Sequence, residues 1–246
     1  MILFPPSNSP NQQPRVPDGV RVYAIGDIHG RADLLDGVLN HIDSDLAKAP
    51  VSNSLEIFLG DYVDRGPDSR GVLDRLVARN LTHRMVFLKG NHETFLSQFV
   101  SKPAILGDWQ RLGGLETLMS YGLTPSINAD TVTQAKLATA LDRAMPPSHR
   151  RFLDDLKSSF TFGDFYFVHA GVRPGISLEK QREEDLLWIR HEFLLCEEDF
   201  GKIVVHGHTP VQQVDIRPNR INIDTGAYAT GSLTCLVLEE DTIRVI

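Results

Sequence analysis

Five short segments of the chain place aspartate or histidine directly after a short apolar run. Carboxylate and imidazole groups together are the ligand mixture that binds Mn, Fe or Zn. In the first three segments the leading glycines lie 34 and 30 residues apart, which is typical of repeated strand–helix units. The five segments are 26–30 (GDIHG), 60–66 (GDYVDRG), 90–93 (GNHE), 168–171 (VHAG) and 205–210 (VHGHTP).

These segments predict a metal centre at one edge of a sheet. The carboxyl ends of parallel strands meet at one edge, which is where α/β proteins bind ligands. Six ligands are too many for one ion with an open position, but they suit two divalent ions about 3.5–4 Å apart that share a carboxylate. Asp61 follows the middle of the first three strands, so we expect it to be shared. The expected ligands are Asp27, His29, Asp61, Asn91, His169 and His208, with Asp64, Arg65 and His92 beside them.

A purely structural explanation of these segments is weaker. One Asp-x-His after a strand is compatible with a capped turn, and Asp61 alone is compatible with a helix N-cap. Five such segments at five strand ends are not explained by capping. None of them contains cysteine, which excludes a structural Cys/His zinc site.

Strands and helices alternate in the first hundred residues. Apolar residues recur at helical spacing between the strands, as in Leu34, Leu35, Val38 and Leu39. This alternation predicts an α/β fold with a mostly parallel sheet covered by helices. The expected strands are 20–25, 55–59 and 85–88, and the expected helices are 31–46, 69–80 and 93–100.

The rest of the chain divides into a tail, an insertion and a strand-rich end. Residues 1–18 are proline-rich and are expected to form a flexible tail, and 19–246 are expected to form a single domain. Residues 101–158 predict a helical insertion or cap, with helical pieces at 109–121 and 135–144. Beyond the insertion we expect a helix at 184–195 and strands at 160–162, 165–168, 203–205, 211–216, 220–223, 233–238 and 242–246.

Composition excludes several classes of protein. The 246 residues are 41% hydrophobic and 23% charged, which is typical of a globular protein and not of a fibrous or disordered chain. The net charge of −7 argues against general nucleic-acid binding. Two unpaired cysteines and the lack of a long apolar run favour a cytoplasmic protein that binds no membrane.

The motifs GDIHG, GDYVDRG, GNHE, HAG and GHTP, in this order, resemble those of the phosphoprotein phosphatase family of calcineurin-like metallophosphoesterases. The resemblance covers about residues 20–226. The GHTP form is similar to the bacterial and phage branch, which includes serine/threonine protein phosphatases and symmetric diadenosine tetraphosphatases. The resemblance implies a four-layer fold, in which a β-sandwich is flanked by helices and the late strands form the second sheet.

The resemblance also implies a role for each motif residue. Asp27 and His29 hold the first metal ion, Asp61 bridges the two, and Asn91, His169 and His208 hold the second. His208 is preferred to His206 because the family's ligand follows the glycine of GHTP. His92 is the general acid and Asp64 its partner. Arg65 and Arg190 bind the substrate phosphate together with Asn91, although Arg173 and Arg182 lie close to Arg190 in sequence.

The expected activity is phosphomonoester hydrolysis by a hydroxide that bridges two divalent ions, Mn first and Fe or Zn as alternatives. A phosphoserine or phosphothreonine protein or peptide is the leading substrate, with phosphotyrosine also possible in the same site. The insertion 101–158 contains few aromatic residues, which argues against a substrate with two bases. The alternative is a symmetric diadenosine tetraphosphatase or a related pyrophosphohydrolase acting on nucleotides or RNA 5′ ends. A non-catalytic binding module is disfavoured because no predicted ligand or acid is missing.

Overall fold

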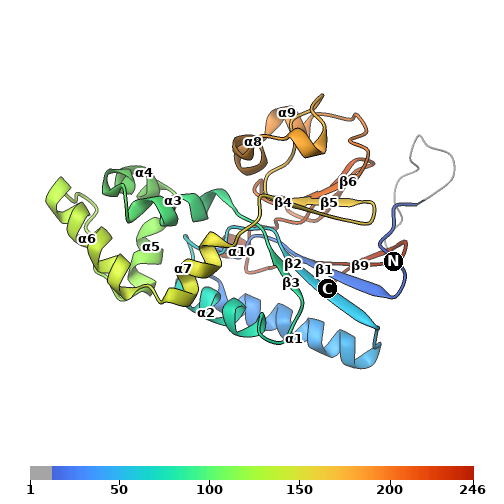
Figure 1. Cartoon of the computed structure of the whole chain (residues 1–246), viewed down its shortest axis with the longest axis horizontal. Coiled ribbons are helices and arrows are strands. Elements are labelled where there is room, and N and C mark those ends of the chain that lie inside the picture. Colours follow the sequence, from blue (N-terminus) through green and yellow to red (C-terminus); the bar gives the residue numbers. More distant parts are fainter. Residues whose placement is uncertain (1–12) are drawn as a thin grey trace.

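Two five-stranded sheets pack face to face in the computed structural model, which describes residues 13–246 (Figure 1). The first sheet has the order β10 (Thr242–Val245), β9 (Cys235–Glu239), β1 (Val20–Ile25), β2 (Asn53–Phe58) and β3 (Met85–Phe87). The second has the order β4 (Ser159–Phe162), β5 (Phe165–Val168), β6 (Ile203–His206), β8 (Arg220–Asn222) and β7 (Asp215–Ile216).

Strand β1 shows why the sheets are layered in this way. Side chains alternate between the two faces of a strand. Val22 and Ala24 belong to the apolar cluster that also contains Phe167 of the second sheet, whereas Tyr23 and Ile25 belong to the cluster formed with the helices. Burial on both faces explains why this strand is almost wholly apolar.

Helices cover the outer face of each sheet and complete four layers (Figure 1). Apolar residues of α1 (Ala32–Lys48) and α2 (Ser69–Arg79) pack against the first sheet. The outer face of the second sheet contacts α8 (Glu183–Trp188) and α9 (His191–Leu194) through a separate cluster that includes Tyr166 and Phe193. This arrangement confirms the predicted α/β sandwich flanked by helices.

The segment 101–158 is helical throughout its ordered elements and lies beside the sandwich (Figure 1). It follows α3 (Asn91–Phe99). Its helices α4 (Leu106–Arg111) and α5 (Gly114–Ser120) are separated at Gly113, whose φ of 92° ends the helical conformation. The elements are η1 (Pro103–Ile105), α4 (Leu106–Arg111), α5 (Gly114–Ser120), α6 (Thr131–Ala144) and α7 (Pro147–Asp154).

Three sequence-based expectations need correction. The late strands do not all join the second sheet, because β9 pairs antiparallel with β1 and β10 pairs with β9. The expected strand 211–216 is reduced to β7, since Val211 donates its backbone N–H to Asp224 outside any ladder. The expected helix 184–195 is two helices, because Ile189 and Arg190 leave the helical conformation.

The expected tail 1–18 falls mostly outside the described residues. Within its described part, Val16 is fully buried and donates its backbone N–H to the carbonyl of Glu240 at 2.9 Å. The chain therefore packs on the sandwich some residues before the predicted start of the domain. The remaining short elements are η2 (Leu178–Lys180) and α10 (Ala227–Thr230). None of the helices in residues 13–246 has both the length and the apolar character needed to span a membrane.

Candidate metal centre

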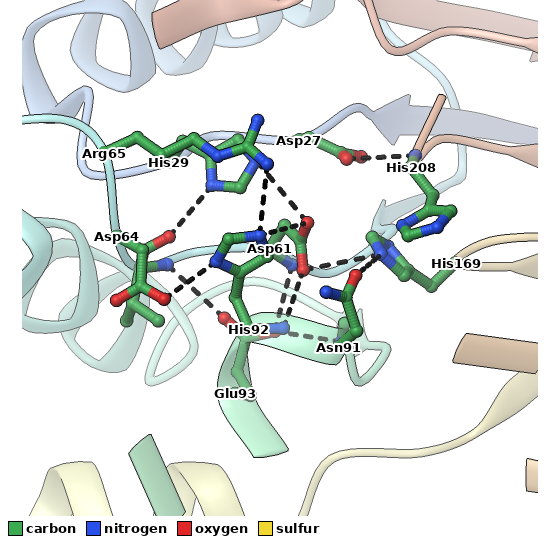
Figure 2. A network of polar contacts seen from close by, with 12 residues as sticks. Asp27, His29, Asp61, Asp64, Arg65, Asn91, His92, Glu93, His169 and His208 are labelled. Carbon is green, nitrogen blue, oxygen red and sulfur yellow. Dashed lines mark hydrogen bonds and ion pairs between the residues drawn. The ribbon is translucent and has the colours of Figure 1, made fainter. Parts of the chain in front are cut away.

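The loops that follow β1, β2, β3, β5 and β6 meet at one edge of the sandwich, and Figure 2 shows their polar side chains converging there. Strands β1, β2 and β3 run parallel, as do β5 and β6, so each group delivers its loops to the same edge. Each of the predicted metal-competent side chains is at most 6% exposed, namely Asp27, His29, Asp61, Asn91, His92, His169 and His208.

Left-handed backbone conformations are concentrated in these loops. Among the described residues other than glycine, six have positive φ, and only Glu240 lies away from the site. Such conformations cost on the order of 1–3 kcal/mol each, and they persist where the surrounding fold holds them. The site residues with positive φ are His29, Asp61, Asp64, Arg65 and His208, at φ between 46° and 72°.

Two glycines allow the loops after β2 and β3 to touch. Gly60 has φ of 108°, and a Cβ atom at this position would lie 2.6 Å from the backbone nitrogen of Gly90. A Cβ atom at Gly90 would in turn overlap Oδ1 of Asp61. The carboxylate of Asp61 thus lies directly against the backbone of the neighbouring loop.

Asp61 lies at the centre of the donor set (Figure 2). Its Oδ2 is 3.4 Å from Nε2 of His29, and its Oδ1 is 3.4 Å from Nε2 of His169. Two donor groups, each compact enough to hold an ion, share this residue: one contains His29 and His92, and the other contains His169 and His208. Asp61 therefore lies within reach of both donor groups, whereas Asp27, which was also expected as a ligand, is in neither of them.

Hydrogen bonds orient two of the histidines so that the lone pair of Nε2 in each ring faces Asp61. Nδ1 of His29 is 2.9 Å from the carbonyl oxygen of Val63, and Nδ1 of His169 is 3.0 Å from that of Leu59. A carbonyl only accepts, so Nδ1 must carry the proton and Nε2 has a lone pair. Nε2 of His169 then faces Oδ1 of Asn91, another acceptor, at 3.0 Å. Two facing acceptors call for a cation between them.

Burial and the crowding of carboxylates also favour the binding of a positive charge at this site. Burial, followed by the charges of Asp224 and Asp61, raises the pKa of Asp27 well above its usual value. Burial lowers the pKa of His29 to about 3 and that of His208 to about 2, so both rings are neutral. Oδ1 of Asp27 and Nε2 of His208 are buried without a hydrogen-bond partner. The donor set therefore fits divalent metal ions with imidazole and oxygen ligands.

His92 and Asp64 form a buried pair beside this donor set. Nδ1 of His92 lies 2.7 Å from Oδ2 of Asp64. Burial alone lowers the pKa of His92, but Asp61 and the hydrogen bond to Asp64 outweigh it and raise the pKa above the usual value. Asp64 thus occupies Nδ1, and Nε2 is the ring nitrogen of His92 that faces the site.

Two arginines lie at the rim of the site. One Nη atom of Arg65 is 3.4 Å from Nε2 of His92, and Nη1 of Arg190 donates to Oγ1 of Thr209 at 3.3 Å. The two other arginines considered from the sequence form ion pairs instead, Arg173 with Asp185 and Arg182 with Glu184.

Comparison with known proteins identifies the family. The family model described as calcineurin-like phosphoesterase matches residues 20–243. The chain belongs to this family. The specific serine/threonine protein phosphatase branch is not confirmed by the comparisons.

Relatives of this phosphoesterase carry a nucleotide-related name. It is 29% identical to the asymmetrical bis(5′-nucleosyl)-tetraphosphatase PrpE of Anoxybacillus flavithermus, with 90% of this chain and 92% of that protein aligned. The protein of the same name from Geobacillus thermodenitrificans is 27% identical, over 91% and 92% of the two chains.

Solved structures of low identity share the fold. A crystal structure of a candidate diadenosine tetraphosphatase has a TM-score of 0.64 at 21% identity, and covers 96% of this chain and 98% of its own. A serine/threonine protein phosphatase from Saccharomyces cerevisiae has a TM-score of 0.55 at 14% identity, over 93% and 79% of the chains.

The structure separates the two histidines of 205–210. His208 belongs to the donor group with Asp61 and His169, whereas the ring of His206 packs edge-on against Phe193, with centroids 4.9 Å apart. Strand β6 ends at His206, and the positive φ of His208 turns that residue out of the strand. The alternation rule for strands, under which both would share a face, therefore does not apply across this pair.

Sequence reasoning missed several residues that support the site. Glu93 is buried and accepts the backbone N–H groups of Asp61 and Tyr62 at 2.9 and 2.8 Å, so it holds the central loop against α3. Trp109 and Thr117 of the helical insertion both donate to Asp64. Glu93 could have been found from the sequence, because it follows His92 directly in the GNHE motif. Trp109 and Thr117 lie in helical segments, and no sequence feature separates them from ordinary core residues.

Proposed function

We propose that this phosphoesterase hydrolyses a phosphoanhydride bond of dinucleoside tetraphosphates, with unsymmetrical cleavage into a nucleoside monophosphate and a nucleoside triphosphate. The proposed reaction class rests on the position of Asp61, which is shared by two buried donor groups. Such a pair of sites is the arrangement used for in-line displacement at phosphorus. The substrate class is supported by relatives named as asymmetrical bis(5′-nucleosyl)-tetraphosphatases over about nine-tenths of both chains.

This proposal replaces the phosphopeptide and the symmetric cleavage expected from the sequence. The scarcity of aromatic residues in 101–158 favours a phosphopeptide over a substrate with two bases. In the structure, Trp188 and Tyr228 come from other segments and lie beside the donor set, with ring centroids 6.1 Å from His208 and 5.4 Å from His29. The aromatic side chains beside the donor set therefore come from outside the insertion.

In the proposed reaction, Asp27, His29 and Asp61 would hold one divalent ion, and Asp61, Asn91, His169 and His208 the other. When bound, the two ions polarise phosphoryl oxygens and activate water. Mn is the expected metal, and Fe or Zn suits the same donors.

The protein's own groups bind the phosphate and handle the proton. Arg65 and Arg190 donate hydrogen bonds to phosphoryl oxygens, which neutralises charge and orients the reacting group. Water adds to phosphorus and loses one proton to solvent as the bond to the leaving phosphate oxygen breaks. His92 gives the proton on Nε2 to that oxygen, while Asp64 keeps hold of Nδ1.

A substrate panel tests the proposal. The Mn-loaded protein is assayed with diadenosine tetraphosphate, a phosphoserine peptide and 5′-capped RNA, and the nucleotide products are separated by chromatography. We expect the highest kcat/KM on the dinucleotide, with AMP and ATP as products. Two molecules of ADP would indicate symmetric cleavage, and a higher kcat/KM on the phosphopeptide would overturn the proposed substrate class.

A further inference from the structure

Tyr228 lies at one end of the donor set. It is part of α10, 39% of its surface is exposed, and its ring packs edge-on against His29. The guanidinium carbon of Arg65 lies 4.6 Å from the centre of the tyrosine ring, a cation–π contact. Tyr228 is therefore held next to a predicted metal ligand and a predicted phosphate ligand, yet much of it faces solvent.

Trp188 lies at the other end. It is the last residue of α8, 41% of its surface is exposed, and its ring is nearly perpendicular to that of His208, at 84°. Phe95 supports it from α3, with ring centroids 6.2 Å apart. Trp188 thus lies beside the donor group that contains His208, and Tyr228 lies beside the one that contains His29.

A continuous row of contacts places the two aromatic rings at opposite ends. His29 contacts one carboxylate oxygen of Asp61 and His169 contacts the other, and the rings of His169 and His208 lie 5.0 Å apart. Figure 2 shows His29 and His208 on opposite sides of Asp61. Trp188 and Tyr228 are also the only large aromatic side chains among residues 13–246 that are exposed. Both rings are therefore accessible to a ligand that enters the site.

Each ring lines a groove of a size suited to a nucleoside. The groove at Tyr228 has a volume of about 610 Å³ and also contains Arg31, Arg65 and Arg75. The groove at Trp188 has a volume of about 400 Å³ and also contains Arg173, Arg182 and Arg190. Small-molecule sites commonly have volumes of about 300–1,000 Å³.

The charges in the two grooves are arranged alike. In the first, Arg31 pairs with Asp33 and Arg75 pairs with Asp36. In the second, Arg173 and Arg182 pair with Asp185 and Glu184. Within the described part of the chain, only Arg65 and Arg190 among these arginines have no carboxylate within ion-pair distance. Each groove therefore offers one unpaired cation at the metal centre and a nearly neutral, aromatic-lined space beyond it.

We infer that Tyr228 and Trp188 are the stacking surfaces for the two nucleosides of a dinucleoside polyphosphate, whose phosphate chain crosses the metal centre between Arg65 and Arg190. The inference rests on the proposed function and adds residues that determine specificity. A nearly neutral groove with an aromatic wall suits an uncharged planar base better than further phosphates. One such groove at each end of the centre suits a substrate with a base at each end.

Calorimetric titration of the metal-loaded protein tests the inference. The two ligands are a methylene-bridged, non-hydrolysable analogue of diadenosine tetraphosphate and the base-free methylenebisphosphonate. Trp188→Leu and Tyr228→Leu keep an apolar side chain but remove the ring. Each is expected to raise the Kd of the dinucleotide analogue about tenfold, the order of a single base–aromatic stack. The loss is expected to be confined to the dinucleotide.

Conservative and remote variants complete the experiment. Trp188→Phe and Tyr228→Phe keep a ring and are expected to restore most of the affinity. Leu195→Ala, at a residue that is 79% exposed and outside both grooves, serves as the matched surface control. Unchanged dinucleotide affinity in both leucine variants, or an equal loss for the base-free ligand, would overturn the inference. Neither result bears on the proposed function, because that function is tested by the substrate panel with the unaltered protein.

Discussion

The indole nitrogen of Trp109 lies 2.9 Å from Oδ2 of Asp64, the same carboxylate oxygen that lies 2.7 Å from Nδ1 of His92. The other oxygen, Oδ1, accepts from the hydroxyl of Thr117 at 2.6 Å. Trp109 and Thr117 belong to α4 and α5. The helical insertion therefore does more than cover the sandwich, because it holds the carboxylate that orients the predicted general acid.

This arrangement predicts that Thr117→Val slows catalysis without removing metal. Valine has nearly the same shape as threonine, so the substitution keeps the packing. It deletes the donor to Oδ1 of Asp64, an acceptor for the backbone N–H of Asp64 and the contact with the hydroxyl of Ser69. We expect kcat to fall about 10-fold, the lower end of the effect of losing a supporting hydrogen bond near a metal site, while elemental analysis shows an unchanged metal content. Thr139→Val, on the exposed side of α6, is the matched control and should retain full activity. Full activity in Thr117→Val would show that Asp64 needs no support from the insertion.

The shared position of Asp61 predicts a different outcome for Asp61→Asn. Because Asp61 belongs to both donor groups, its replacement by a neutral amide should weaken both sites. We expect elemental analysis of the metal-loaded variant to find about one ion per chain or fewer, in place of the pair. Asp108→Asn removes an exposed carboxylate of α4 and should leave the metal content intact. Retention of two tightly bound ions by Asp61→Asn would contradict the bridging assignment.

His92 is predicted to act on the leaving group rather than on the metal. His92→Asn should keep the metal content and lower kcat by about 10²–10⁴-fold on phenyl phosphate, whose leaving oxygen needs a proton. The loss should be smaller on 4-nitrophenyl phosphate, since nitrophenolate is already a stable anion. His92 also lies 3.7 Å from Oδ2 of Asp61, within reach of the first donor group. Equal losses on the two substrates, accompanied by loss of metal, would therefore assign it as a ligand.

The strand ends explain how much of the site was visible in the sequence. Asp27, His29, Asp61, Asn91 and His169 all follow strands that were predicted from short apolar runs, and parallel pairing brings such ends together. Local spacing carries this information, so the sequence predicts that these residues lie together at one edge. It places Asp27 among the ligands of the first ion, whereas the compact donor group in the structure contains His92 in its place.

The remaining residues of the site are brought together by contacts between segments that are distant in the sequence. Trp109 and Thr117 look like core residues of amphipathic helices, and only the packing of the insertion brings them to Asp64. Trp188 and Tyr228 lie 40 residues apart and outside the metal-binding motifs, so their placement at the two ends of the centre has no local signature. Likewise β9 pairs with β1 in the first sheet, and strand propensity alone does not determine which strand becomes its partner.

A buried histidine far from the metal centre predicts how stability depends on pH. His149 is 1% exposed, its Nδ1 lies 2.7 Å from the hydroxyl of Tyr121, and its Nε2 lies 3.0 Å from Oδ1 of Asp74. Burial lowers its pKa below the usual value of 6.5, and the charge of Asp74 offsets this only in part. Below about pH 6.5 the unfolded chain therefore binds more protons at this residue than the folded chain, so acid favours unfolding.

The measurement compares urea unfolding at pH 7.5 and pH 5.5 for the native chain and for His149→Gln, which cannot take up the proton. Above the unfolded pKa the native histidine is neutral in both states, so its stabilising contacts count in full. As the pH falls through the window below 6.5, that contribution is lost, and the difference in unfolding free energy between the native chain and the variant should shrink. Ser148→Ala, on the same helix, should follow the pH dependence of the native chain. A difference that stays constant between the two pH values would mean that His149 takes up its proton as readily in the folded protein as in the unfolded chain.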